Sequence, residues 1–380
     1  MVMYKMIAFK LLMSTLTTLL TSCSSTGQVI SSGSGSAQLP MSIHQRADVS
    51  EFNNIYPSTF LGKGPHSKYD QVDYLLESER AFKSYTVVSR GNMDFDRVLG
   101  YDYRNFMVKP DIKTLKFSKI PSVTWLGHAS FLLKLSDGTS LLTDPVFGDF
   151  DGIIGSLSHF LFDEFERIAP SVVSASELDF VDAVLVSHNH YDHFNMETIG
   201  QLGPNINYYV PLNFENYFTD NFSHVYAMDW YTGRQLNQNK VHFVPAHHYS
   251  GRSFFDENET LWGGWVVESN NLKIYFSGDT GYTPIFKDIV AKYGEMDVCL
   301  MAIVAYAFDG RDIHMAPEDA LKSADELGCK TFIPWGYGTW ATGYEHVLEP
   351  LRRLRHAMID NHYQFEIVEL KMGETLTFKR

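Results

Sequence analysis

Cysteine, excess positive charge and long apolar runs are all scarce in this chain of 380 residues. Three cysteines are too few for the disulfide framework that stabilises many small secreted domains. Lysine and arginine number 31 against 45 aspartates and glutamates, a formal net charge of -14. This balance argues against a nucleic-acid partner, which would need a basic face. The length is sufficient for a substantial core, in one large domain or two.

The one pronounced apolar run, Leu11–Leu20, is too short to span a bilayer as a mature helix. It follows a lysine and ends in small residues before Cys23, so residues 1–23 are expected to be a signal peptide outside the fold. This ending resembles the signal of bacterial lipoproteins, which are cut before the cysteine and acylated on it. An ordinary secretory signal with an incidental cysteine is the alternative. With Ser24 rather than aspartate next, the expected location is the bacterial envelope, lipid-anchored in the outer membrane and facing the periplasm.

Composition divides the rest of the chain into three parts. Residues 24–50 are rich in serine and glycine, which predicts a flexible tether between the lipid anchor and the domain. Residues 51–115 mix aromatic and charged side chains without periodicity and are expected to be an N-terminal extension packed on the main domain. Residues 116–380 carry the main domain. Cys299 lies in an apolar run and is interpreted as a small buried hydrophobic residue, although a disulfide with Cys329 stays open.

Short apolar strands alternate with amphipathic helices from Ser122 onward, which predicts an α/β fold with sheets covered by helices. The expected strands are 122–126, 131–135, 140–143, 183–187, 208–211, 241–245, 264–268, 272–277, 298–303, 331–333 and 364–370. The expected helices are 196–202, 284–293, 317–327 and 345–355. The third has proline and acidic residues in its first turn and Gly328 after its end, which are typical start and stop signals.

The segment Val184-Leu-Val-Ser-His-Asn-His-Tyr-Asp-His193 is the strongest chemical signal. Alternate residues of an extended chain share a face, so His188 and His190 can converge on one ion. Asp192 and His193 follow where the chain should turn, and they can point at a second ion nearby. A histidine-rich surface loop is the simpler explanation for a single His-x-His pair. The full spacing after an apolar strand favours a metal site for hydrolysis.

Further candidate ligands follow later apolar strands. A pair of histidines, His247 and His248, ends one strand, and Asp279 stands in a glycine-flanked turn after another. Asp144 follows a third strand in the same way. A single aspartate there would be an ordinary turn residue. Because strand ends that point the same way lie along one edge of a sheet, these side chains are expected to converge with the His-x-His-x-Asp-His segment.

With these segments in place, the chain resembles the metallo-β-lactamase superfamily. More narrowly, it is similar to the branch that contains N-acyl-phosphatidylethanolamine-hydrolysing phospholipase D and the L-ascorbate-6-phosphate lactonases. The segments that carry the resemblance are Trp125-Leu-Gly-His-Ala-Ser130, Leu142-Thr-Asp-Pro-Val-Phe147, Val186-Ser-His-Asn-His-Tyr-Asp-His193, Val244-Pro-Ala-His-His248, Phe276-Ser-Gly-Asp-Thr-Gly-Tyr282, His314-Met-Ala-Pro-Glu318 and Glu345-His-Val-Leu-Glu-Pro350. The resemblance implies a four-layer αββα sandwich.

The resemblance also implies a role for each candidate residue. His188, His190 and His248 would hold a first zinc ion, Asp192 and His193 would hold a second, and Asp279 would bridge the two. His314 matches a position used in substrate binding or catalysis, and Asp192 could orient the attacking water, so both are candidate catalytic residues. His128 and Asp144 are expected to support the ligands from behind. A structural histidine is the alternative for His128 and for His314.

The sequence departs from the family pattern in one place. The family ends its site with a histidine in a strand-end His-Trp-Gly segment, and the corresponding stretch here is Phe332-Ile-Pro-Trp-Gly-Tyr-Gly-Thr-Trp340. Pro334 takes the ligand position, and an alignment shifted by two residues puts Gly336 there. Neither side chain can coordinate a metal. The second zinc is therefore expected to bind more weakly, unless another side chain replaces the histidine.

These features predict a zinc-dependent hydrolase that uses a metal-bound hydroxide. The leading hypothesis is a phosphodiesterase of the phospholipase D type that acts on N-acyl-phosphatidylethanolamine-like lipids, with the membrane reached through the N-terminal lipid anchor. A lactonase or ester hydrolase for a small soluble substrate is the nearest alternative. A tethered binding protein with a degraded site is the third, and its support is Pro334.

Overall fold

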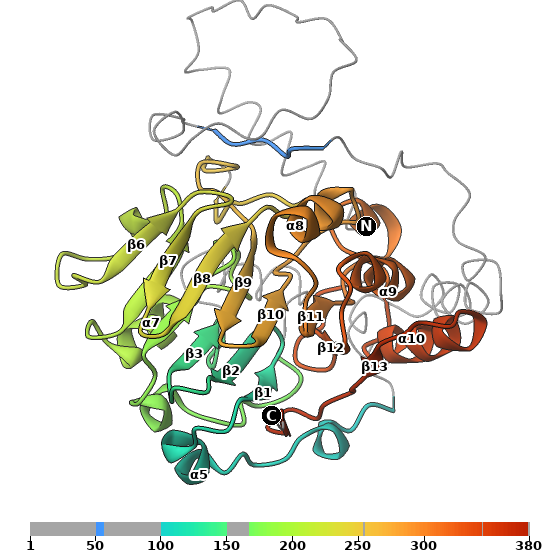
Figure 1. Ribbon diagram of the computed structural model, residues 1–380, viewed down its shortest axis with the longest axis horizontal. Helices are drawn as coiled ribbons and strands as arrows, with labels where there is room; N and C mark the ends of the chain where they lie inside the picture. The colour runs from blue at the N-terminus through green and yellow to red at the C-terminus, as the bar shows by residue number, and fades with distance from the viewer. Residues whose placement is uncertain (1–50, 57–99, 150–166, 254, 344, 379–380) are drawn as a thin grey trace, which may run out of the picture. The chain divides into compact units, whose positions relative to one another are not determined.

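Two mixed sheets of seven strands each form the centre of the structure, a computed structural model that describes residues 51–56, 100–149, 167–253, 255–343 and 345–378 (Figure 1). The first sheet has the order β14 (Thr375–Thr377), β1 (Ser122–Gly127), β2 (Ser130–Lys134), β3 (Ser140–Thr143), β4 (Ala183–Leu185), β5 (Asn207–Pro211), β6 (Val225–Met228). The second has the order β13 (Glu366–Ile367), β12 (Thr331–Trp335), β11 (Val298–Ala302), β10 (Leu272–Phe276), β9 (Gly264–Ser269), β8 (Asn239–Val244), β7 (Gly233–Leu236).

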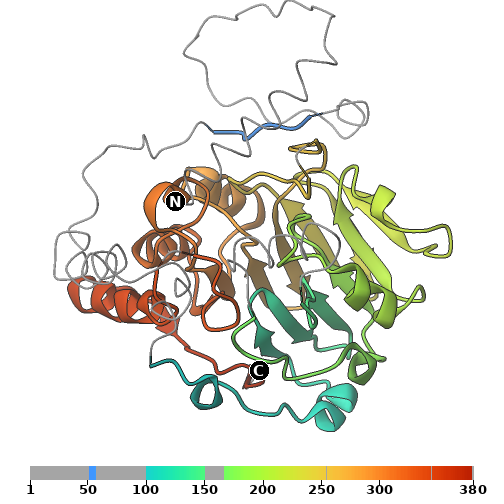
Figure 2. The same cartoon turned by 180° about the vertical axis from the view of Figure 1, so that it is seen from behind.

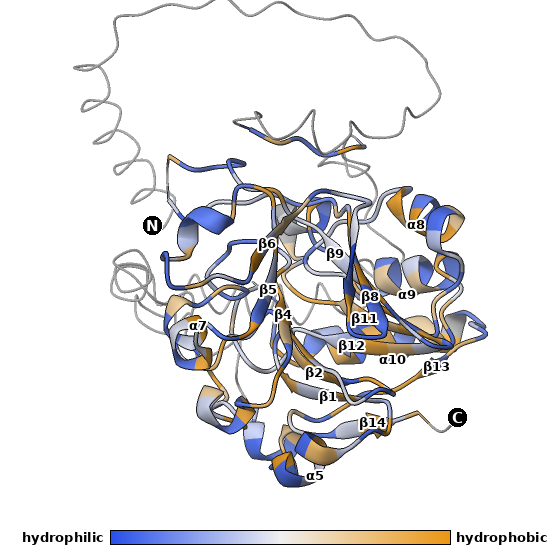
Figure 3. Ribbon diagram, turned by 60° about the vertical axis from the view of Figure 1, so that its left-hand side comes forward, coloured by the Kyte–Doolittle hydropathy of each residue, from blue (hydrophilic) through white to orange (hydrophobic). Residues whose placement is uncertain are grey.

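Helices cover the two outer faces. The helices of the described residues are α5 (Ile112–Phe117), α7 (Met196–Leu202), α8 (Ile285–Tyr293), α9 (Pro317–Glu326) and α10 (Glu349–Asp360). α7 lies beside the first sheet, and α8 and α9 lie beside the second (Figure 3). Seen from behind, the teal strands of the first sheet stand in front of the second sheet (Figure 2). The expected αββα sandwich is therefore confirmed.

Burial on both faces explains why the strands are almost continuously apolar. Every residue of β1, β2, β3, β4 and β11 is buried, the pattern of strands that pack on a helical layer on one side and on the other sheet on the other side. Trp265 connects the two sheets, because its indole donates a hydrogen bond to the carbonyl of Val186 across the interface at 3.1 Å. This bond holds the chain just before His188.

The strand directions bring the ends of several strands to one edge. β3 and β4 are parallel, and β1 runs the same way because two antiparallel pairings separate it from β3. In the second sheet, β10, β11 and β12 are parallel, and β8 shares their direction through β9. Parallel neighbours need crossover connections, which α7, α8 and α9 supply. We call the edge where β1, β3, β4, β8, β10 and β12 end the strand-end rim.

Most of the expected elements are present, with some differences. The helix expected at 345–355 spans Glu349–Asp360, because Pro350 is tolerated only in the first turn of a helix. The strand expected at 364–370 is reduced to β13, which pairs only with the first two residues of β12. Strands β6, β7 and β14 and helix α5 were not expected from the sequence. β6 and β7 are edge strands with partly exposed side chains, so they lack the apolar pattern of the central strands.

Cys299 and Cys329 form a disulfide, with their Cα atoms 6.0 Å apart. Cys299 is buried in the core, as expected, and the disulfide that the sequence left open is present. Cys299 lies in β11 and Cys329 lies just before β12, the neighbouring parallel strand. Strand pairing thus brings the two sulfur atoms together.

The N-terminal calls fall largely outside the described residues. The signal peptide 1–23, its lipidation site Cys23 and the tether 24–50 all lie outside them, and so does most of the extension 51–115. The described part of the extension includes residues 51–56, where Tyr56 donates a hydrogen bond to Asp288 of α8 at 2.6 Å. Among the described helices, none combines the length and apolarity needed to cross a bilayer.

Candidate metal centre

Candidate site residues that follow five strands meet at the strand-end rim. His128 follows β1, Asp144 follows β3, the His188–His193 segment follows β4, His248 follows β8 and Asp279 follows β10. Close approach of the backbone makes this possible at Gly278, whose φ is +54° and whose added Cβ would lie 2.8 Å from the Cβ of Ser187. The glycine before Asp279 therefore lets the two sheets meet directly beside the site.

His188, His190 and His248 form the first group of candidate ligands. His188 Nε2 lies 2.9 Å from His190 Nδ1, which lies 3.2 Å from His248 Nε2. These separations approach the edge of about 3.3 Å of a tetrahedron with metal–nitrogen bonds of about 2.0–2.1 Å. All three rings are buried or nearly so, and all three nitrogen atoms lie within 4.8 Å of one another. His247, the other member of its pair, faces Asp312 at 3.8 Å and is not in this group.

The outer hydrogen bonds of these rings place the lone pairs on the inside. Ser187 Oγ gives its single proton to Asp144 Oδ2, so it accepts from His188 Nδ1 at 2.9 Å. His248 Nδ1 donates to the carbonyl of Ile313 at 3.1 Å. The Nε2 atoms of His188 and His248 therefore carry lone pairs that face His190 Nδ1, and one cation between the three nitrogens could bind all of them. The donor set fits a divalent metal ion such as zinc.

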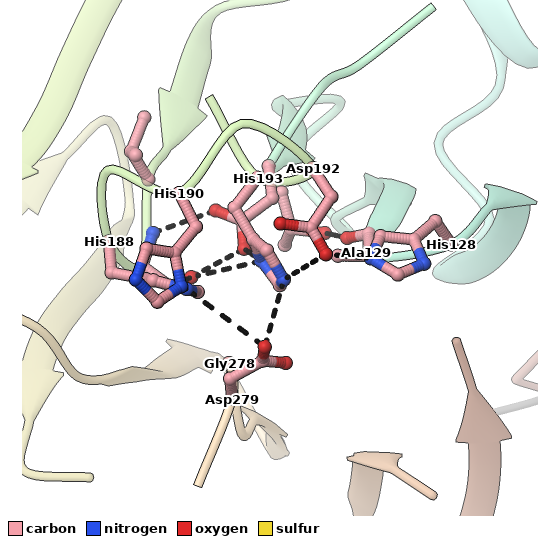
Figure 4. Close-up of polar contacts among 12 residues, drawn as sticks. His128, Ala129, His188, His190, Asp192, His193, Gly278 and Asp279 are labelled. Carbon is pink, nitrogen blue, oxygen red and sulfur yellow. Dashed lines mark hydrogen bonds and ion pairs between the residues drawn. The ribbon is translucent and has the colours of Figure 1, made fainter. Parts of the chain in front are cut away.

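Asp192 and His193 form a second group together with His128. His128 Nε2 lies 3.0 Å from Asp192 Oδ2, and His193 Nε2 lies 3.7 Å from the same oxygen (Figure 4). His193 Nδ1 donates to Asp144 Oδ2 at 2.7 Å, which turns Nε2 towards the site. That Nε2 is buried and makes no hydrogen bond to any described residue. A buried nitrogen of this kind fits a metal ligand.

Asp279 lies between the two groups. Its Oδ2 is 3.3 Å from His193 Nε2 and 3.9 Å from His188 Nε2 (Figure 4). The same oxygen is 3.9 Å from His248 Nε2. His314 completes this side, with Nδ1 3.6 Å from the same oxygen and a side chain 15% exposed. The residues named from the sequence as ligands are thus brought together. Asp279 lies where a carboxylate could bridge two ions.

Burial and charge oppose each other in this cluster. Burial holds the pKa values of His188 and His248 well below the usual range and lowers that of His190 to about 4. These rings are therefore neutral at pH 7, as metal ligands must be. Burial also disfavours the charged forms of Asp192 and Asp279, but the charge on His193 outweighs it and lowers the pKa of both carboxyl groups.

The pKa of His193 moves in the opposite direction. Its burial would lower the pKa, but the surrounding carboxylates of Asp279, Asp192 and Asp144 outweigh that effect and raise the pKa well above the usual range. Without a metal ion, the cluster thus draws a proton to His193. The excess of carboxylate favours a cation at this position, which a divalent ion can supply instead.

Two supporting residues, Asn54 and Ser187, were not expected from the sequence. Asn54 donates to the carbonyl of His248 at 2.9 Å and accepts from its backbone NH at 3.1 Å. Ser187 links Asp144, His188 and His193 through one hydroxyl group. Ser187 adjoins the histidine motif, so its position could have suggested a role. Asn54 lies 194 residues from its partner and could not have been found in this way.

The structure also shows which residue occupies the position of the missing histidine. Pro334 lies inside β12, paired with Met301, and Gly336 is the first residue past Trp335 at the strand end. The carbonyl of Gly336 lies 3.3 Å from His128 Nδ1. Gly336, rather than Pro334, therefore occupies the strand-end position beside the second group.

Comparisons with known proteins agree with this geometry. Residues 139–337 match the family described as the beta-lactamase superfamily domain. An uncharacterized protein of Mycobacterium tuberculosis is 34% identical over 252 residues, which cover 63% of this chain and 65% of that protein. The chain thus spans slightly less than two thirds of this relative. N-acyl-phosphatidylethanolamine-hydrolyzing phospholipase D 1 of Caenorhabditis elegans is 31% identical over 252 residues, 62% of this chain and 69% of the relative.

Two further matches concern location and fold. The outer membrane protein RomA of Klebsiella pneumoniae is 39% identical over 98 residues, 26% of this chain and 74% of RomA. A possible metal-dependent hydrolase from Veillonella parvula has a crystal structure with a TM-score of 0.55 and 18% identity, covering 68% of this chain and all of that one (100%). The second match concerns the fold alone.

Proposed function

The chain belongs to the beta-lactamase superfamily, and on this premise we propose that it is a metal-dependent hydrolase, more specifically a zinc-dependent phosphodiesterase of the phospholipase D type. The proposed substrates are N-acyl-phosphatidylethanolamine and similar lipids. The observation that carries the proposal is Asp279 Oδ2, which faces both groups of candidate ligands and can bridge two ions. The relative from Caenorhabditis elegans supports the choice of substrate by its named activity.

Divalent ions held by the two groups would lower the pKa of a bound water and stabilise negative charge on the substrate oxygens. The side chains of this chain then have separate tasks. Asp192 is ionised and its side chain is 19% exposed, so it can accept a hydrogen bond from the attacking water. The ring of His314 is partly exposed beside Asp279, so it can contact a substrate oxygen or protonate the leaving group.

The surface next to the first group favours an amphiphilic substrate. Tyr249 is 38% exposed, and its ring lies 4.5 Å from that of His190 and 4.9 Å from that of His248 between centroids. Exposed aromatic side chains beside a polar site can contact acyl chains while the headgroup reaches the ions.

A direct assay tests the substrate proposal. Purified protein with zinc or manganese is incubated with N-acyl-phosphatidylethanolamine and with ordinary glycerophospholipids, and phosphatidic acid and N-acylethanolamine are measured by mass spectrometry. We expect both products from the first lipid and none from Asp279→Asn, while His242→Ala, a buried histidine outside the cluster, retains activity. Loss of product across the lipid panel, with hydrolysis of a lactone or small ester instead, would reject the phospholipase assignment in favour of a small-substrate hydrolase.

We further propose that the protein resides in the bacterial envelope and is lipid-anchored at Cys23. The similarity to an outer membrane protein supports the location, and the disulfide between Cys299 and Cys329 suits an oxidising compartment. Labelling of growing cells with a radioactive fatty acid should mark the protein, and Cys23→Ser should abolish the label. An unlabelled wild-type protein in the soluble fraction would contradict the anchor.

A further inference from the structure

The second group lacks a ligand from β12 for a steric reason as well as a chemical one. Gly336 has φ of +102°, a conformation that side-chain-bearing residues rarely adopt. A Cβ at this position would lie 2.5 Å from Cγ2 of Val304. The backbone conformation at Gly336 therefore excludes a side chain. A further nitrogen ligand for the second ion has to come from another segment.

His128 occupies the space in front of this glycine and is held rigidly. Its backbone NH donates to Thr339 Oγ1 and its carbonyl accepts from the Trp125 indole, both at 2.8 Å. The φ of His128 is +46°, and the side chain is almost fully buried. Such a conformation costs free energy for a residue with a Cβ and persists where the surrounding structure requires it. The strain is used here to turn the ring towards Asp192.

The two ring nitrogens of His128 both face oxygen atoms. Nδ1 lies 3.3 Å from the carbonyl of Gly336, and Nε2 lies 3.0 Å from Asp192 Oδ2. A neutral imidazole carries one proton, so either tautomer leaves one lone pair facing an oxygen acceptor. A metal ion between Nε2 and the carboxylate removes that repulsion when Nδ1 donates to Gly336. His193 and His248 have the same arrangement, with Nδ1 donating to an oxygen and Nε2 turned inwards.

We propose that His128 is a direct ligand of the second ion and replaces the histidine that β12 does not supply. Its Nε2, Asp192 Oδ2 and His193 Nε2 lie within 4.8 Å of one another, and Asp279 Oδ2 completes the set. Two imidazoles and two carboxylates are a suitable ligand set for zinc. The second position is then complete, and the weaker binding expected from the sequence does not follow. This inference rests on the metal centre of the proposed function but not on its substrate.

Metal counting tests the inference without any assay of activity. His128→Asn is the main variant, because asparagine tolerates positive φ and can still donate a hydrogen bond to Asp192, but lacks the imidazole nitrogen. His128→Ala removes both interactions. Each protein is loaded with zinc, passed into metal-free buffer and measured by mass spectrometry of the metal. We expect two ions per chain in the wild type and in His242→Ala, and one in both His128 variants.

Cobalt substitution separates coordination from mere orientation. Loss of an imidazole from the second ion should alter the visible absorption of the cobalt-loaded protein, whereas loss of a supporting hydrogen bond should leave the coordination sphere unchanged. Retention of two ions by His128→Asn with an unaltered cobalt spectrum would overturn the proposal, as would a wild type that binds a single ion. Equal melting temperatures of wild type and variants in chelator would show that the variants fold. A two-ion protein inactive on phospholipids would refute the substrate and leave the role of His128 standing.

Discussion

Asn54 forms two hydrogen bonds with the backbone of His248, which lies 194 residues away in the sequence. The Asn54 side chain donates to the carbonyl of His248 and accepts from its NH. The same Asn54 oxygen accepts from the indole of Trp262 at 3.2 Å. A segment before the main sandwich thus fixes the backbone of a candidate metal ligand, while Ile313 fixes its ring. The arrangement connects the N-terminal extension to the chemistry of the site.

Removal of the two hydrogen bonds between Asn54 and His248 should weaken binding of the first metal ion. Asn54→Ala leaves two backbone groups of His248 without their partner, which is expected to cost about 1–3 kcal/mol of unfolding free energy. We also expect a measurably higher dissociation constant for the first ion by isothermal titration calorimetry. Asn53→Ala, at the exposed neighbouring position, serves as the control and should change neither quantity. Equal affinity in both variants would show that His248 needs no support from this segment.

Asp144 should control the second ion through His193. Asp144→Asn removes the carboxylate that accepts from both His193 Nδ1 and Ser187 Oγ, and asparagine tolerates the φ of +33° found there. Loss of a partner of this kind costs about 10–100-fold in metal affinity. Competition with a zinc-binding dye would measure it. Asp297→Asn, at a carboxylate that pairs with Lys330 on the surface, should leave the affinity unchanged, and a similar fall in both would refute the specific role of Asp144.

Metal removal should destabilise the folded protein. The inner nitrogens of His188, His190 and His248 face one another at close range, so all three could bind the same ion in the folded state only. Ligand present at about 100 times its dissociation constant stabilises the native state by about 2.7 kcal/mol. We expect chelator to lower the melting temperature by several degrees and zinc to restore it, with the response much reduced in His188→Ala. A melting temperature indifferent to chelator would argue that no ion binds here.

Glu349 should make stability fall as the pH rises. Burial, with help from the charge of Glu345, raises the pKa of Glu349 from its ordinary 4.5 to about 8. Between these values the folded state holds a proton that the unfolded state has released, so unfolding free energy decreases with increasing pH in this window. Glu349→Gln should flatten that slope and make the variant relatively more stable at pH 8 than at pH 5. Denaturant titrations at pH 5 and pH 8 measure the unfolding free energy of both proteins. The same change with pH in wild type and variant would contradict the assignment to Glu349.

The disulfide should contribute substantially to stability. Cys299 and Cys329 are separated by 30 residues, and a loop of that size is expected to add about 3.6 kcal/mol by restricting the unfolded chain. The double variant Cys299→Ser/Cys329→Ser should lose about that amount in denaturant unfolding. Reductant should destabilise the wild type and leave the double variant unaffected. A wild type insensitive to reductant during unfolding would indicate that the bond contributes little.

Local sequence determined most of the strands and the core of the candidate site, whereas the αββα arrangement was implied by the resemblance to the metallo-β-lactamase superfamily. The central strands could be predicted because burial on both faces requires continuous apolar runs. The His188–His193 segment could be predicted because its candidate ligands lie close together in the sequence. The candidate ligands His248 and Asp279 were accessible for the same reason, since each directly follows such a strand. The edge strands β6 and β7 could not be predicted, because partly exposed strands need no continuous apolar run.

Tertiary structure alone decided how distant segments complete the site. Strand order brings His128 against Asp192 and Gly336, and it joins Cys299 to Cys329 and Asn54 to His248. None of these pairings has a local signature, because a contact between remote residues depends on the direction and register of every strand between them. The sequence shows that the histidine of the family pattern is missing. Only the tertiary structure, in which β1 and β12 end at one edge, brings His128 to that position.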